Sequence, residues 1–252
     1  MSARLDKVEF ALRMGDNSLV LGHRLSEWCG HAPVLEEDLA ISNTALDLLG
    51  FARQWLGYAG DMEGRGRDED KLVFGRDAHE YRNVLLAEQD NGNYADTLAR
   101  QLYFDIWHLL MWEGLGRSTD GKMAQWSLKA KDAVTFHARR SADLVVRLGD
   151  GSEDSHRRMQ AAVDEFWIFT GELFEVDASD QRLIDAGVIP DMRLTQPHWL
   201  DRVSRILTQA TLETPTGIAM RSGGRRGVHS EYLGFLLAEM QFLPRAYPGA
   251  KW

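Results

Sequence analysis

The stretch from Pro33 to Ala59 constrains the fold more than any other part of this sequence. On a helical projection, one side of it carries five leucines and the opposite side carries four further apolar residues. The first side consists of Leu35, Leu39, Leu46, Leu49 and Leu56, and the second of Ile41, Leu48, Ala52 and Trp55. A helix that is apolar on two opposite sides has no broad face for solvent. The pattern therefore predicts a buried central helix from Pro33 to about Gly60.

The few polar residues of this helix fall on one narrow stripe. The stripe consists of Glu36, Asn43, Asp47 and Gln54. Polar groups inside a core are costly unless they have hydrogen-bonding or charged partners. We therefore expect this stripe to meet partners on other helices, and those partners are either a metal ion or other side chains.

The rest of the chain predicts further helices that are separated by short turns. After a lead-in over residues 1–15, helices are expected at 18–29, 71–88, 93–116, 118–148, 152–174, 181–186 and 230–243. Residues suited to N-caps precede several of them, among them Asp16-Asn17-Ser18, Asn93 and Ser152. The stretch 199–212 fits either a helix or a partly extended segment. The sequence contains no repeat and no Pro- or Ser-rich linker, which favours a single all-α domain over residues 1–252.

Charge and cysteine content exclude several classes of protein. The formal net charge is −9, and acidic and basic residues are interspersed, so no basic face for nucleic acid or an anionic membrane is expected. The chain has one cysteine, which cannot form an internal disulfide and suits a reducing compartment. No apolar run is long enough to span a bilayer, and no signal-peptide core is evident. We expect a soluble cytoplasmic protein.

Inward-facing acids and histidines on the long helices form the candidate site. A di-iron carboxylate centre in a four-helix bundle needs one Glu from each of two helices and a Glu-x-x-His pair from each of the other two. Asp47 can supply the lone acid of the central helix, and Asp105 and His108 have the carboxylate-x-x-His spacing. The third helix offers only His137. The fourth offers Asp164 and Glu165 without a histidine three residues later, so the ligand set is incomplete.

These residues allow two interpretations. In the first, Asp47, Asp105, His108 and His137, with Asn43 and Gln101, form a hydrogen-bonded network that fixes the register of the bundle. The chain then has no catalytic, metal-binding or cofactor-binding residue. In the second, the same four residues form a variant metal site, and the chain is itself a metal-dependent oxygenase. Iron storage is a third class of function, against which the incomplete ligand set argues.

A glycine- and arginine-rich loop, Arg221–Gly227, is a weaker candidate. Glycines expose backbone amides and arginines bind phosphate, so the loop could contact a phosphate or a nucleotide-bearing ligand. No strand precedes it and no P-loop lysine follows, which favours a mobile or partner-contacting loop instead. The sequence leaves this contact open.

Four segments resemble a known family. They are GHRLSEWCGHAPVLEEDLAISNTALDLLGFAR, GNYADTLARQLYFDIWHLL, RLGDGSEDSHRRMQ and EYLGFLLAEMQFLPRAYPGAKW. In this order they resemble the PaaC subunits of bacterial phenylacetyl-CoA epoxidases, from about residue 17 to the C-terminus.

This resemblance implies a ferritin-like four-helix bundle with additional helices, in a multicomponent oxygenase of phenylacetate catabolism. It implies that the catalytic subunit PaaA carries the di-iron centre and the acyl-CoA, and that a reductase component supplies electrons from NADPH through FAD and an iron–sulfur cluster. The PaaC-like chain is then a non-catalytic structural subunit that pairs with PaaA, and a homodimer is also possible. Candidates for core or interface on the last helix are Tyr232, Phe235, Leu236 and Phe242.

Overall fold

The computed structural model describes residues 2–250, and every regular element in that range is a helix. The all-α prediction is therefore confirmed. The chain divides into two compact units. The first takes its described residues from two parts of the sequence, 2–90 and 222–250, and the second is the continuous stretch Asn91–Arg221. None of the helices within residues 2–250 is long and apolar enough to cross a membrane. A single domain over the whole chain stays a prediction.

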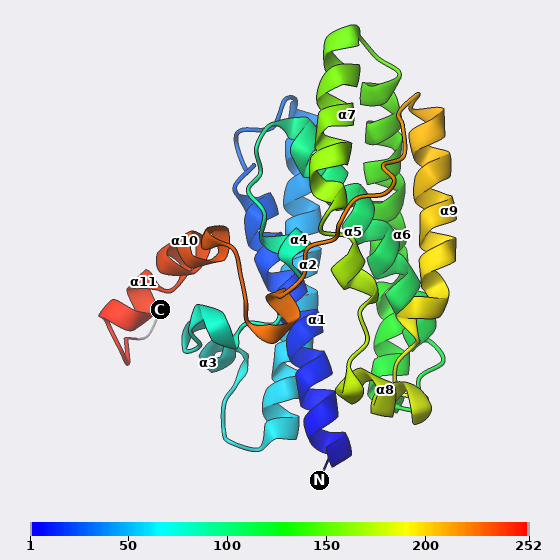
Figure 1. The fold of residues 1–252 in the computed structure, drawn as a ribbon. Coiled ribbons are helices and arrows are strands. Elements are labelled where there is room, and N and C mark those ends of the chain that lie inside the picture. The colour runs from blue at the N-terminus through cyan, green and yellow to red at the C-terminus, as the bar shows by residue number, and fades with distance from the viewer. Residues whose placement is uncertain (1, 251–252) are drawn as a thin grey trace. The chain divides into compact units, whose positions relative to one another are not determined.

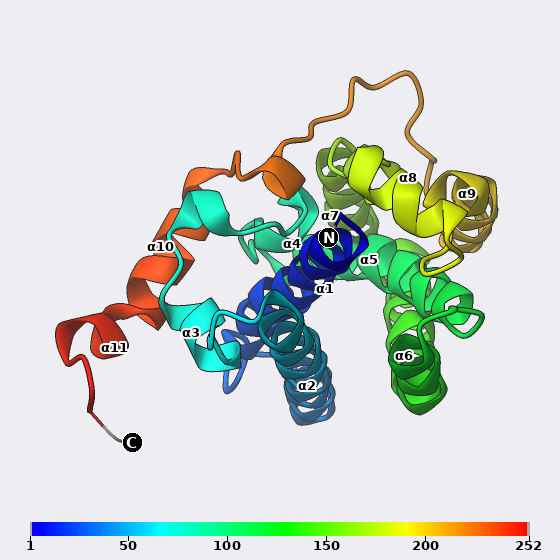
Figure 2. The ribbon, with the colours of Figure 1, turned by 90° about the horizontal axis from the view of Figure 1, so that it is seen from below.

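The first unit is built on two long helices. α1 (Ser2–Ser26) and α2 (Leu35–Glu63) lie side by side and run in opposite directions (Figures 1 and 2). The chain continues through α3 (Glu69–Phe74), a 3₁₀ turn (Ala78–Glu80) and α4 (Leu85–Glu88). The C-terminal part adds a 3₁₀ turn (Gly224–Arg226), α10 (Glu231–Met240) and α11 (Phe242–Ala246).

The second unit is organised around α5 (Tyr94–Leu115). α6 (Gly121–Gly149), α7 (Glu153–Trp167) and α9 (Met192–Gln209) pack against it (Figure 1). A 3₁₀ turn (Gly171–Phe174) and α8 (Ala178–Asp185) connect α7 to α9. Nearly every side chain of α5 is buried, so α5 is the core helix of this unit.

Helix starts that depend on local capping agree with the sequence predictions. The Asn93 side chain accepts the Ala95 N–H at 2.8 Å, and Asp96 accepts the Asn93 N–H at 2.7 Å, which completes a capping box. The Asp120 and Ser152 side chains also accept backbone N–H groups in the first turns of α6 and α7. The expected helices at 93–116 and 118–148 are therefore confirmed within a few residues, and the one at 152–174 is α-helical only as far as Trp167.

The prediction of a lead-in followed by a helix from Ser18 is wrong. α1 is continuous, and Asp16, Asn17 and Ser18 lie buried in its interior. The side chains of Asp16 and Asn17 bond to distant groups instead of capping a helix start. Asp16 pairs with Arg76, and Asn17 Oδ1 accepts the Val84 N–H at 2.7 Å. Asp16 and Asn17, which have a strong capping preference, therefore link α1 to the segment that follows α3.

The prediction that α2 is buried on both sides is also wrong. The side with Ile41, Leu48 and Trp55 is buried, as expected. On the other side, Leu35 and Leu46 are 71% and 66% exposed. The polar stripe does not lie in a core either. Its residues Glu36, Asn43 and Asp47 are exposed and Gln54 is half-buried.

The helix predicted at 71–88 is broken into three short pieces. The break follows from Arg76, whose buried side chain donates to the carbonyl oxygens of Leu72 and Glu80 and to the Asp16 carboxylate. A continuous helix would carry the guanidinium away from these acceptors. The final helix is also divided, because Pro244 has no N–H to bond the Met240 carbonyl. The ambiguous stretch 199–212 is helical as far as Gln209, in α9.

Candidate functional site: a buried polar cluster on α5 and α6

The structure brings together three of the four predicted site residues. Asp105 and His108 on α5 and His137 on α6 are between 1% and 3% exposed, and His137 interacts electrostatically with both of the others. Asp47 belongs to the first unit, where it is exposed on α2. Asn43 is exposed on the same helix. The polar cluster of the second unit therefore consists of residues of α5 and α6.

His108 is held among aromatic rings. Its Nε2 accepts a hydrogen bond from Trp112 Nε1–H at 2.7 Å, and the Trp107 ring is stacked on it at 14°. Burial, with a contribution from nearby His137, lowers the pKa of His108 to about 3. His108 is therefore a neutral imidazole. Because Nε2 accepts this hydrogen bond, the ring proton is on Nδ1.

Asp105 lies one helical turn before His108. Its Oδ1 accepts a hydrogen bond from Gln101 Nε2 at 3.3 Å. Burial raises the pKa of Asp105 to about 6, although His137 and the Ser141 hydroxyl oppose the rise. At neutral pH most molecules therefore hold a buried carboxylate at this position, and its desolvation costs folding free energy.

This cluster does not fit a di-iron centre. Such a centre needs carboxylates from four helices, but Asp164 and Glu165, the acids expected of the fourth, are exposed on α7. The Nε2 lone pair of His108 is already used by Trp112. Within residues 2–250, no three His, Cys, Asp or Glu side chains are grouped so that they could hold a metal ion. The arrangement suits a polar network that fixes how α5 and α6 pack.

A second buried cluster, in the first unit, escaped the sequence analysis. The Glu88 carboxylate is fully buried and accepts hydrogen bonds from Asn83 Nδ2 at 2.8 Å, His229 Nδ1 at 2.7 Å and the Ser230 N–H at 2.6 Å. Ser230 is the N-cap residue of α10, whose start agrees with the helix predicted from residue 230. The only local signal was that an acid, Glu88, follows the apolar run Val84–Ala87, and this signal does not indicate which residues contact it.

The glycines of the loop Arg221–Gly227 serve close packing. A Cβ on Gly224 would lie 2.2 Å from the Asn83 carbonyl oxygen. Gly227 has a positive φ of 79°, and a Cβ there would lie 2.1 Å from the His79 carbonyl oxygen. The N–H groups of Arg226, Gly227 and Val228 donate to carbonyl oxygens inside the loop. These three amides are therefore already bonded and do not form a phosphate cradle.

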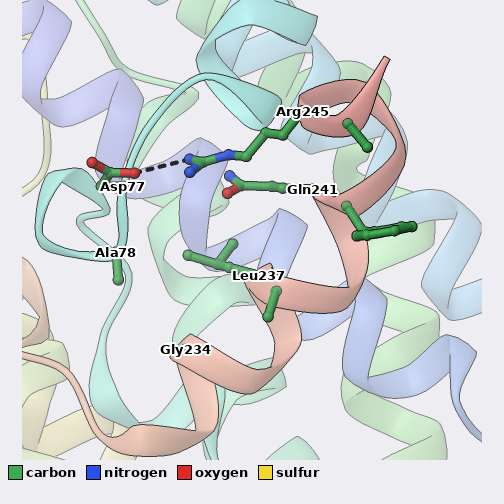
Figure 3. Close-up of a pocket in the computed structure, with 9 residues that line it drawn as sticks. Asp77, Ala78, Gly234, Leu237, Gln241 and Arg245 are labelled. Atoms are coloured by element: carbon green, nitrogen blue, oxygen red, sulfur yellow. Dashed lines mark hydrogen bonds and ion pairs between the residues drawn. The ribbon is translucent and has the colours of Figure 1, made fainter. Parts of the chain in front are cut away.

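A pocket of about 520 Å³ opens beside the C-terminal helices of the first unit. Figure 3 labels six of its lining residues, Asp77, Ala78, Gly234, Leu237, Gln241 and Arg245. Its polar side chains bond to the protein itself. Gln241 Nε2 donates to the Val73 and Arg76 carbonyl oxygens, and Arg245 Nη2 pairs with Asp77 at 3.0 Å.

Comparison with known proteins decides the family. The family model described as phenylacetic acid catabolic protein matches residues 1–252. The chain belongs to the phenylacetic acid catabolic protein family. A relative in Escherichia coli strain K12, named as a component of 1,2-phenylacetyl-CoA epoxidase, is 47% identical over 243 residues, which cover 96% of this chain and 98% of the relative. The family is ferritin-like, so the predicted fold class is confirmed.

The polar cluster of this family member leads to a prediction about stability. Because the pKa of Asp105 rises from 3.8 unfolded to about 6 folded, the native state binds the proton more tightly. Stability should therefore fall as pH rises from about 4 to about 6. Asp105→Asn removes this dependence. It should match wild type near pH 4 and be more stable at pH 7 by about 3 kcal/mol, since each pKa unit corresponds to about 1.4 kcal/mol.

Denaturant unfolding between pH 4 and pH 8 measures this difference. Asp132→Asn, at an exposed position of α6, is the matched control and should keep the wild-type profile. An Asp105→Asn variant that is less stable than wild type at pH 7 would contradict the prediction, because it would show that the carboxylate stabilises the fold.

Proposed function

We propose that this chain is a non-catalytic structural subunit of a phenylacetyl-CoA 1,2-epoxidase, and that it pairs with and stabilises a di-iron catalytic subunit of the PaaA type. The observation that carries the proposal is the α5–α6 cluster. It keeps a carboxylate-x-x-His pair in a buried position, but the Nε2 lone pair of His108 accepts Trp112 Nε1–H. The proton of the neutral ring is then on Nδ1, so neither ring nitrogen offers a lone pair to a metal. The relative named as a component of such an epoxidase supports the same assignment.

In the proposed complex the chemistry takes place elsewhere. Phenylacetyl-CoA, O₂, NADPH and a proton give the ring-1,2-epoxide, NADP⁺ and water. The catalytic subunit holds iron and the acyl-CoA, and a reductase with FAD and an iron–sulfur cluster delivers the electrons. This chain contributes no group to the reaction. We place the complex in the cytoplasm, because a single cysteine suits a reducing compartment.

A subunit that acts by association needs apolar surface. Large apolar side chains are exposed on α2, where Leu35, Leu39 and Leu46 are more than half exposed, and near the C-terminus, where Phe235 and Phe242 are 65% and 63% exposed. Apolar and aromatic side chains of this kind are enriched at the buried centres of protein interfaces. Of the candidates for core or interface on the last predicted helix, Leu236 is a core residue.

Metal content and mass test the proposal. The chain is purified alone and after co-expression with the catalytic subunit. The molecular mass and the iron content of each species are then measured. We expect no stoichiometric iron in the chain alone, and about two irons for each catalytic subunit in the complex. About two irons in the chain alone would contradict the proposal, as would failure of the two subunits to associate.

A substitution separates the structural role from catalysis. His108→Gln keeps a hydrogen-bond acceptor for Trp112 but removes the imidazole. The complex should assemble with it and keep its epoxidase activity. Loss of activity in a fully assembled complex would instead favour a variant metal-dependent oxygenase built on Asp105, His108 and His137.

A further inference from the structure

Buried and partly buried hydrogen bonds attach the C-terminal segment, residues 222–250, to the rest of the first unit. Arg24 on α1 donates from Nη2 to the Tyr232 carbonyl oxygen at 3.0 Å and to the Glu88 carbonyl oxygen at 3.1 Å. The Glu88 side chain accepts the Ser230 N–H, and Gln241 reaches the Val73 carbonyl oxygen. His229 adds contacts to Glu88 and to the Tyr81 carbonyl oxygen.

Each ring nitrogen of His229 faces a hydrogen-bond acceptor. Nδ1 lies 2.7 Å from Glu88 Oε2, and Nε2 lies 3.1 Å from the Tyr81 carbonyl oxygen. The His229 side chain is 5% exposed and that of Glu88 is fully buried. A carboxylate and a carbonyl oxygen only accept, whereas a neutral imidazole donates from one nitrogen alone. Both contacts are satisfied together only by the doubly protonated imidazolium.

The charges around His229 favour this cation. Glu88 on α4 supplies the direct negative charge, and Asp16 on α1 adds to it, although Arg76 partly neutralises Asp16. Arg82 shares the Tyr81 carbonyl oxygen with His229 and contributes a positive charge at 2.8 Å from that oxygen. The net effect of these surroundings is to raise the pKa of His229. Burial alone would lower it, but the Glu88 carboxylate, which accepts a hydrogen bond and carries a negative charge, outweighs burial together with the Tyr81 carbonyl and Asp16.

We propose that His229 is a proton-dependent clamp, which anchors residues 222–250 to α4 and the Tyr81 backbone while it is doubly protonated and loosens them when it loses a proton. The neutral ring would turn the Nε2 lone pair toward the Tyr81 carbonyl oxygen, so an attraction becomes a repulsion. Glu88 would keep its bonds to Ser230 and Asn83. The loosening is therefore local to the C-terminal segment and leaves the α1–α2 pair in place.

The direction of the pH dependence follows from the raised pKa. The stabilisation is fully present below about 6.5, the pKa of an unperturbed histidine. It is lost as pH rises through the higher folded value. The C-terminal segment should therefore be held at and below neutral pH and become more open in alkaline solution.

Hydrogen–deuterium exchange on the full chain tests the clamp. Exchange is measured from pH 6 to pH 9, corrected for the intrinsic rate, and compared between peptides from residues 222–250 and peptides from α5. Protection of the C-terminal peptides should fall by about tenfold over this range, because a hydrogen bond to a charged group contributes about 1.5 kcal/mol or more. Protection of the α5 peptides should not change in this way.

Two variants and one direct measurement complete the test. His229→Gln cannot titrate, so it should show low protection of residues 222–250 at pH 6 and no further loss at higher pH. His31→Gln, at an exposed histidine of the same unit, should behave as wild type. Nitrogen-15 NMR of the histidine rings should show His229 protonated at both nitrogens at pH 6.5. A neutral ring there, or unchanged protection from pH 6 to pH 9, would overturn the proposal.

Discussion

Replacing Asp16 by alanine should lower the free energy of unfolding by about 3–5 kcal/mol, the range found when one partner of a buried ion pair is removed. The Asp16 side chain is fully buried and that of its partner Arg76 is 3% exposed. Asp16 also accepts the Arg82 N–H at 2.8 Å. The variant would leave the buried Arg76 guanidinium without its counter-charge and the partly buried Arg82 N–H without its acceptor. Denaturant unfolding followed by tryptophan fluorescence measures the loss.

An exposed ion pair provides the control for this prediction. Asp154 on α7 pairs with Arg158 at 2.8 Å, but both side chains are more than half exposed. Water solvates such charges well, so Asp154→Ala should not measurably change the unfolding midpoint. Similar losses from Asp16→Ala and Asp154→Ala would mean that burial of the Asp16–Arg76 pair is not what makes it important.

Trp55→Ala should cost about 3–5 kcal/mol, the range for removing a large aromatic side chain from a core. Trp55 is fully buried on the inner side of α2, and the Phe10 ring of α1 meets it edge-on at 5.6 Å. Alanine would leave a cavity between the two longest helices of the first unit. Thermal and denaturant unfolding both report the loss.

The outer side of the same helix supplies the comparison. Leu35→Ala removes a side chain that is 71% exposed and should change stability by no more than about 0.5 kcal/mol in the isolated chain. A large loss from Leu35→Ala would show that the outer side of α2 is covered in the isolated chain. Trp55→Ala with wild-type stability would contradict the assignment of the inner side as core.

Features that depend on neighbours in sequence could be predicted, and those that depend on distant contacts could not. Asn93 and Asp96 cap α5 through bonds that span two and three residues, and the capping preference of Asn93 was sufficient to predict the helix start. Asp16 and Asn17 have the same capping chemistry, but they bond to Arg76 and to the Val84 N–H, 60 or more residues away. Nothing in the local sequence distinguishes the two cases.

The same distinction explains which residues of the two buried clusters could be predicted from the sequence. Asp105 and His108 share one face of α5 because residues three apart do so, and their inward direction was predicted correctly. Asp47 looked equivalent, but the apolar residues of α2 do not reveal which side is covered by protein. The Glu88–His229 pair joins residues 141 positions apart, a separation that no motif spacing predicts.

The division of the chain into a continuous unit and a split unit has a consequence for synthesis on the ribosome. Every residue of the second unit has been translated once Arg221 is added. Translation of the first unit begins earlier. Residues 222–250, which contain the hydrogen-bond partners of Glu88, Val73 and Arg24, are nevertheless translated only after the whole second unit. The first unit therefore cannot finish folding until the second has been made, and a nascent chain stalled before His229 would expose the buried Glu88 carboxylate to its surroundings.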